Sequence, residues 1–162
     1  MVMGLCWAAS IGTRFNYFNS LAGHSTKLTA YYIYIRLKAQ YGSEPSGTKD
    51  WILNGYDFFC SNFKTTQYYS GMMIYSEITT QLKNKNPIHI SLTNGAKFHS
   101  VILSGIKIYN GYALYYIDDP NSPTTAHISA YVSSDTMNAK SNFVYQMNSS
   151  STKYMTWYRS FY

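Results

Sequence analysis

The sequence predicts an α+β fold, with helices in the first part of the chain and an antiparallel sheet in the second. Up to about residue 86, apolar residues recur at helical spacing between capping residues and glycines. After Pro87, apolar and polar residues alternate with the period of a strand, and Asn110-Gly111 is a strong hairpin signal. We therefore expect a single domain over residues 1–162, with a helical half at about 1–86 and a sheet half at about 87–162.

The helical half is bounded by ordinary capping and breaking residues. Four helices are expected there: at about 6–19, from a cap at Ser25 or Thr26 to about 40, from a cap at Asp50 to a stop at Asn54-Gly55, and from a cap at Ser76 over 77–84.

The sheet half begins with an alternation typical of a half-buried strand. Ile88, Ile90 and Leu92 alternate there with polar residues, and Thr93-Asn94-Gly95 turns the chain. Further strands are expected at 99–108, 112–117, 126–132, 142–147 and, as a last edge strand, 154–158, with a loop at 148–151.

The charge is sparse and basic. The chain has 13 Lys+Arg against 7 Asp+Glu, a net charge of +6, and 18 tyrosines. The basic residues are scattered, so no dedicated nucleic-acid site is expected. No long apolar run could span a membrane, and residues 1–5 lack the features of a signal peptide. The composition favours a folded, extracellular bacterial protein.

Cys6 has the sequence context of a reactive nucleophile. It stands where the first helix should begin, and Ile11, Phe15 and Phe18 place one stripe of that helix toward a core. The positive end of a helix dipole favours thiolate, which is the nucleophilic form of cysteine. Cys6 is therefore poised to attack a carbonyl, provided that a histidine meets it.

The other cysteine and three of the histidines suit ordinary roles. Cys60 follows an aromatic run and is expected to be a buried, inert thiol, although a Cys6–Cys60 disulfide is an alternative that would abolish the nucleophile. His24, His89 and His127 suit surface or hydrogen-bonded roles. Their spacing with the cysteines fits no zinc pattern, so neither metal nor cofactor is expected.

Three short motifs follow one another along the chain: Gly4-Leu5-Cys6-Trp7, then Phe98-His99-Ser100-Val101, then Asp118-Asp119-Pro120. Together they resemble the papain-like cysteine peptidases, in particular the compact bacterial branch that includes the peptidases of bacteriocin-processing transporters. The likeness extends from Cys6 to about Asn121.

The resemblance implies a papain-like fold and a cysteine endopeptidase of the thiol protease class. Cys6 would be the nucleophile, His99 the general acid and base, and Asp119 the orienting acceptor. Cys6 and His99 would meet in the cleft between the two halves. The substrate would be a peptide or protein, and the enzyme would be secreted or on the cell surface. A secreted precursor would carry its signal and any inhibitory pro-segment upstream.

The third member of this triad has rivals. An ideal turn at Asn110-Gly111 puts Asp118 on the His99 face, but opposite Leu103 and about 13 Å along the strand from His99. Pro120 cannot donate to a ladder, so the strand should end or bulge near it, and a bulge would turn Asp119 back toward His99. Asn121 is the second choice, because papain-like enzymes can use Asn there.

The chain departs from the family at the oxyanion hole. The family takes one donor from the backbone N–H of the nucleophile and another from an upstream Gln, and no Gln precedes Cys6 here. Two other functions therefore stay open. One is acyl transfer of the transglutaminase type, which uses the same order of Cys, His and Asp. The other is a catalytically degenerate domain that acts in binding or adhesion.

Overall fold

The computed structural model describes residues 4–109, 112–121, 126–131, 144–146 and 154–162. Helices precede an antiparallel sheet, which confirms the α+β prediction. The chain divides into two compact units, Met1–Gln67 and Tyr68–Tyr162, which are described separately below. The division falls earlier in the chain than the expected 86/87 boundary, so the last helix belongs to the second unit.

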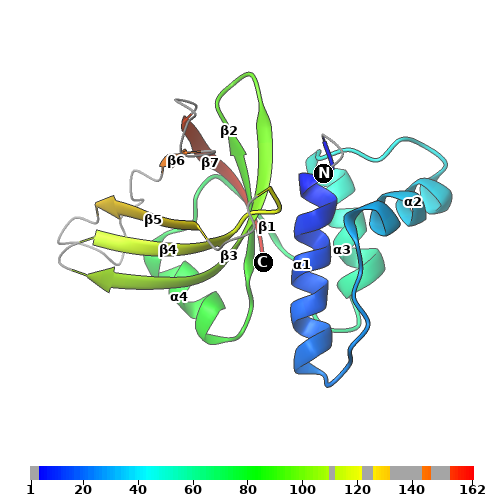
Figure 1. Cartoon of the computed structure of the whole chain (residues 1–162), viewed down its shortest axis with the longest axis horizontal. Coiled ribbons are helices and arrows are strands. Elements are labelled where there is room, and N and C mark those ends of the chain that lie inside the picture. Colours follow the sequence, from blue (N-terminus) through cyan, green and yellow to red (C-terminus); the bar gives the residue numbers. More distant parts are fainter. Residues whose placement is uncertain (1–3, 110–111, 122–125, 132–143, 147–153) are drawn as a thin grey trace. The chain divides into compact units, whose positions relative to one another are not determined.

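The first unit contains three helices: α1 (Cys6–Leu21), α2 (Ala30–Tyr41) and α3 (Lys49–Cys60) (Figure 1). Helix α1 packs against both α2 and α3. Its buried stripe includes Trp7, Ile11 and Phe18, which recur at helical spacing as the sequence predicts.

Helix α2 begins later than expected, so the prediction of a cap at Ser25 or Thr26 is wrong. The N-cap is Thr29, whose side chain accepts a hydrogen bond from the N–H of Tyr32 at 3.2 Å. Just before it, the side chain of Asn16 bonds the backbone of Leu28 twice, accepting from its N–H at 2.8 Å and donating to its C=O at 3.2 Å. These bonds use both backbone polar groups of Leu28, so the helix starts after it.

Helix α3 runs through Asn54-Gly55, where the sequence predicts a stop, and its N-cap is Thr48 rather than Asp50. The reason is the packing of α3 on α1. A Cβ at Gly55 would lie 2.5 Å from Cδ1 of Ile11. Glycine therefore gives Ile11 room at the contact between α1 and α3, and it does not terminate the helix here.

The second unit holds a sheet and one helix. Its elements are β1 (Tyr68–Ser70), α4 (Tyr75–Lys83), β2 (Ile88–Thr93), β3 (Phe98–Tyr109), β4 (Tyr112–Asp118), β5 (Ala126–Tyr131), β6 (Val144–Gln146) and β7 (Tyr154–Phe161). The described strands form one sheet in the order β1-β7-β2-β3-β4-β5, with β6 also paired to β7, and every pairing is antiparallel.

Two element predictions in this unit are wrong. Helix α4 has its N-cap at Ile74 rather than Ser76, and the side chain of Glu77 accepts from the N–H of Ile74 at 3.4 Å. The last strand, β7, is an interior strand rather than an edge, because β1 and β2 pair with its two sides. The predicted turn at 110–111, the predicted loop at 148–151 and the outer ends of the strands predicted at 126–132 and 142–147 lie outside the described residues.

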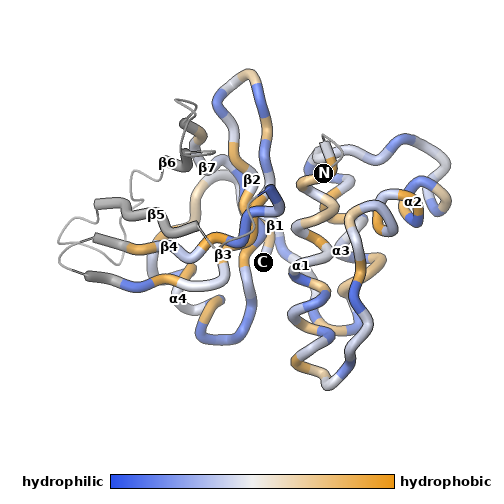
Figure 2. Tube along the Cα trace, in the orientation of Figure 1, coloured by the Kyte–Doolittle hydropathy of each residue, from blue (hydrophilic) through white to orange (hydrophobic). Residues whose placement is uncertain are grey.

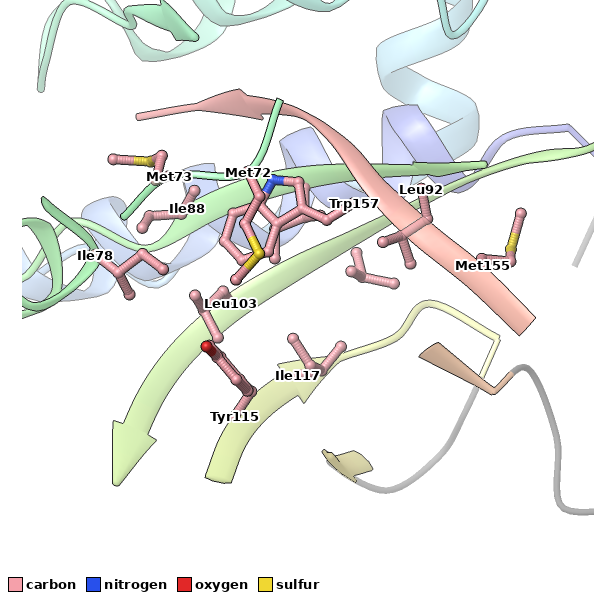
Figure 3. Packing of buried hydrophobic residues seen from close by; sticks show 12 residues of the cluster. Met72, Met73, Ile78, Ile88, Leu92, Leu103, Tyr115, Ile117, Met155 and Trp157 are labelled. Atoms are coloured by element: carbon pink, nitrogen blue, oxygen red, sulfur yellow. The ribbon is translucent and has the colours of Figure 1, made fainter. Parts of the chain in front are cut away.

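The core of the second unit lies on one face of the sheet (Figure 3). Ile88, Ile90 and Leu92 of β2 contribute to it together with Ile78 of α4. The remaining members are Met72, Met73, Val101, Leu103, Tyr115, Ile117, Met155 and Trp157.

Strand β2 is not half-buried as predicted, since its polar residues His89 and Ser91 are buried as well. An alternating pattern distinguishes the two faces of a strand, but it does not reveal whether the polar face is also covered. Within the described part of the chain, no helix has the length and hydropathy needed to cross a bilayer.

Candidate functional site

His99 and Asp119 form a buried hydrogen-bonded pair in the second unit. Nε2 of His99 lies 2.8 Å from Oδ1 of Asp119, and the two side chains are 2% and 5% exposed. His99 is near the start of β3, and Asp119 directly follows β4. Burial screens this pair from water, so the carboxylate is well placed to orient the imidazole ring and to stabilise its charged form.

A β-bulge determines which aspartate reaches His99. Tyr109 pairs with Tyr112, as the hairpin signal predicts, but the register shifts between Leu103 and Gly105. Ile102 therefore pairs with Asp118, where the ideal turn predicts Leu103. With this shift Asp119 lies on the same side of the sheet as His99. The bulge lies in β3, opposite Tyr116 and Ile117, rather than at Pro120, whereas β4 ends at Asp118, as expected for a strand that meets a proline.

Asn121 supports the pair through its backbone. Its N–H donates to Oδ1 of Asp119 at 2.8 Å, the same oxygen that lies beside His99. An aspartate that accepts from the N–H two residues later forms an Asx turn, and Pro120 between them restricts the backbone of that turn. The carboxylate is thus fixed by its own chain. The side chain that meets His99 is that of Asp119, and Asn121 acts as a backbone donor.

Cys6 is the first residue of α1 and is half-buried. The N-cap, Leu5, makes no side-chain capping bond, and no acidic residue lies in the first turn. The N-terminal end of a helix carries partial positive charge, which favours negative charge at this position. Cys6 belongs to the first unit, whereas the structure brings His99 and Asp119 together within the second.

Cys60 has the environment of an inert thiol. It is the last residue of α3 and is 0% exposed. Burial raises the pKa of Cys60 to about 12, although the positive charge of Arg14 opposes the shift. Cys6 and Cys60 are not joined in a disulfide, so the alternative of a bridge between them is wrong for this structure.

Arg14 is a buried charge that the sequence analysis did not single out. Its guanidinium carbon lies 4.7 Å from the ring centre of Tyr56 and 5.3 Å from that of Phe18, and Nη1 donates to Oγ1 of Thr66 at 3.0 Å. The signal was present, because Arg14 falls on the buried stripe of α1. Burial raises the pKa of Tyr56. The pKa of Lys64 is lowered mainly by burial and in addition by the positive charge of Arg14.

The other histidine side chains that the structure describes lie in different surroundings. His24 is exposed in the loop after α1, and His89 is buried with its ring centre 5.2 Å from that of Phe161. The side chain of His127 lies outside the described residues. Among the residues that the structure describes, no three His, Cys, Asp or Glu side chains gather as a metal site would require.

No protein-family model matches the chain, and no curated protein matches it in sequence. Function must therefore be argued from the chemistry of the described residues. Among these, His99 and Asp119 form a buried acid–base pair, and Cys6 is a thiol at a helix start.

Proposed function

We propose that this protein is a papain-like cysteine peptidase that hydrolyses peptide bonds through Cys6, His99 and Asp119. The observation that carries the proposal is the buried contact between Nε2 of His99 and Oδ1 of Asp119. A structural histidine does not need a carboxylate that is itself held in place by a turn. A catalytic histidine does, because its ring must keep one orientation while it gains and loses a proton.

The contact also assigns a role to each ring nitrogen. When the imidazole is neutral, a hydrogen bond from Nε2 to Asp119 keeps the proton on Nε2, so that Nδ1 is the basic atom. The proposal therefore requires Nδ1 of His99 to exchange a proton with Sγ of Cys6. In the resting pair the proton resides on Nδ1 and the sulfur is a thiolate, which the N-terminus of α1 also favours.

The reaction would proceed in two stages. The thiolate of Cys6 attacks the carbonyl carbon of the peptide, and His99 then gives its Nδ1 proton to the leaving amine, which leaves a thioester on Cys6. Water then attacks the thioester, and His99 takes a proton from the attacking water. The thiolate of Cys6 departs as the carboxylic acid forms. Asp119 keeps its charge throughout and stabilises the imidazolium.

The tetrahedral intermediates carry a negative oxygen that needs donors. The backbone N–H of Cys6 would supply one of them at the start of α1, where a developing anion is favoured. The family's second donor is a Gln before the nucleophile, and the sequence has none there.

Selective alkylation of Cys6 tests the proposal directly. Iodoacetamide at pH 6 should modify Cys6 far faster than a small thiol, because an ordinary thiol of pKa about 8.5 is less than about 1% thiolate at that pH. His99→Ala should slow the modification, as measured by mass spectrometry of the intact protein. His24→Ala, which removes an exposed histidine of the first unit, is the matched control and should leave the rate unchanged.

Two results would contradict the proposal. One is a Cys6 alkylation rate equal to that of a small thiol, and the other is a rate that His99→Ala does not alter. The reaction itself is then tested with labelled protein substrates in the presence of a primary amine. New termini indicate hydrolysis, amine incorporation indicates the acyl transferase, and binding without turnover indicates the degenerate domain.

A further inference from the structure

An exposed aromatic pair lies beside His99 in the chain. Phe98 is 66% exposed, and its ring centre lies 5.7 Å from that of Tyr158. Phe98 is the first residue of β3 and directly precedes His99. Burial of a phenylalanine ring is favourable, because it lowers the free energy of the apolar surface in water. An exposed ring in an ordered strand is therefore a good anchor for another molecule.

A second bulge determines the position of Tyr158. Ser91 pairs with Arg159 and Leu92 pairs with Trp157, so Tyr158 is the extra residue of β7 at this point. A bulge redirects a side chain that a regular ladder would place elsewhere. At this point the ring of Tyr158 on β7 contacts the ring of Phe98 on β3.

One cation contacts the aromatic pair, and a second directly precedes Phe98 in the sequence. The guanidinium carbon of Arg159 lies 4.7 Å from the ring centre of Tyr158, and Lys97 is exposed immediately before Phe98. A guanidinium that contacts a ring still has N–H donors in its plane, and these match the two oxygens of a carboxylate. Lys97, Phe98, Tyr158 and Arg159, which we call the Phe98 platform, thus combine apolar surface with positive charge.

The hairpin that carries half of this platform is held by its own hydrogen bonds. Oδ1 of Asn94 accepts from the N–H of Ala96 at 3.1 Å and of Lys97 at 2.8 Å. Oγ1 of Thr93 accepts from the N–H of Gly95 at 3.0 Å and donates to the C=O of Lys97 at 3.0 Å. Figure 2 shows hydrophilic and hydrophobic segments following one another along this hairpin. A preordered loop loses little entropy when a ligand binds.

We propose that the Phe98 platform binds an acidic segment of the peptide substrate, in which an Asp or Glu stands beside a large apolar residue. The apolar side chain would pack on Phe98 and Tyr158, and the carboxylate would pair with Arg159 and Lys97. The term substrate rests on the proposed peptidase function, whereas the binding does not. The net charge of +6 adds attraction for an acidic ligand and disfavours a second copy of this chain as the occupant.

Peptide binding to the full-length chain tests the platform without turnover. The chain carries Cys6→Ser, and the probes are two fluorescein-labelled octapeptides that alternate Leu with Glu or Leu with Gln. Fluorescence anisotropy should show that the Leu/Glu peptide binds at least about tenfold more tightly, and that added salt reduces the difference. Arg159→Gln and Phe98→Ser should each weaken binding of the Leu/Glu peptide about tenfold, and Arg159→Lys should restore part of the loss.

Matched variants separate this effect from general charge or apolar surface. Lys83→Gln removes an exposed cation at the end of α4, and Tyr31→Ser removes a similarly exposed ring on α2, and neither should change the affinity. Equal binding of the two peptides, or equal losses in the matched variants, would overturn the proposal. Peptide cleavage without acidic preference would refute the platform alone. Acidic binding without any cleavage by the unmodified chain would refute the peptidase alone.

Discussion

Each of the two compact units buries a basic side chain, but the two solve the problem differently. In the first unit Arg14 lies against the rings of Tyr56 and Phe18 and donates to the hydroxyl of Thr66. In the second unit His99 lies against the carboxylate of Asp119. Arginine stays charged at every physiological pH, so rings and a neutral oxygen can hold it permanently. Histidine gains and loses its proton near neutral pH, and a carboxylate beside it stabilises the protonated ring.

The comparison separates a cation that is held by rings and a hydroxyl from a histidine whose ring is oriented by a carboxylate. Arg14 acts on its neighbours through a fixed charge and opposes the rise in the pKa of Cys60. His99 is held at one nitrogen by Asp119, which is in turn held by the N–H of Asn121. A side chain that reacts must keep one orientation, so the group that orients it is typically held in place as well. A side chain that only packs does not need this second support.

The same contrast divides the two cysteines of the first unit. Cys6 begins α1 and is half-buried, whereas Cys60 ends α3 and is fully buried. A helix N-terminus favours a thiolate, and a buried helix C-terminus disfavours it.

The largest expected effect would break or confirm this contrast between the cysteines. Cys6→Ala should lower kcat/KM for peptide hydrolysis by at least about a thousandfold, because the nucleophile is lost. Cys60→Ala should leave kcat/KM nearly unchanged. The measurement is the initial rate on a peptide that the unmodified chain cleaves. Equal losses in the two variants would remove the assignment of Cys6 as nucleophile.

The next effect concerns the carboxylate of the second unit. Loss of the orienting acceptor lowers kcat by up to about 10⁴-fold in a triad, so Asp119→Ala, which leaves no acceptor for Nε2 of His99, should lower kcat by at least about tenfold. Asp118→Ala is the matched control, since Asp118 is half-buried one position earlier and pairs with Ile102 instead. Its kcat should stay within about twofold of the unmodified chain. A larger effect from Asp118→Ala would show that the bulge does not determine which aspartate orients His99.

A smaller effect tests the packing that holds the first unit together. Gly55→Ala should change the free energy of unfolding by less than about 1 kcal/mol, because the strain of displacing Cδ1 of Ile11 opposes the higher helix propensity of alanine. Ile11→Val removes that atom and costs about 1 kcal/mol alone. The double variant should be more stable than the sum of the two single effects predicts, as urea unfolding would measure. Additive effects would mean that the two residues are not in contact.

The last effect is absent near neutral pH and appears only at alkaline pH. The pKa of Cys60 rises from 9.0 to about 12 on folding, so the folded state keeps a proton that the unfolded state releases. Stability from this group is complete below pH 9 and is lost as the pH rises to 12, by up to about 1.4 kcal/mol per pH unit. Urea unfolding between pH 8 and 11 should therefore show a gentler decline for Cys60→Ala than for the unmodified chain. Identical declines would place the titration elsewhere.

Several features of this protein could be predicted from the sequence because they depend on neighbours in the chain. The start of α1 at Cys6, the turn that begins at Thr93 and the antiparallel pairing of Tyr109 with Tyr112 follow from local propensity and turn chemistry. The sequence predicts Asp119 as the partner of His99 because it precedes proline, and this prediction rests on the resemblance rather than on geometry.

Other features were decided only by the tertiary structure, because they depend on residues far apart in the chain. Gly55 resembles a helix stop until α1 lies against it, and only the packing shows that Tyr56 and Phe18 cover the guanidinium of Arg14. The bulge between Leu103 and Gly105 has only the weak local signal of a glycine inside a strand, yet it decides which aspartate faces His99. Local rules determine what each segment prefers, and packing determines which side chains then meet.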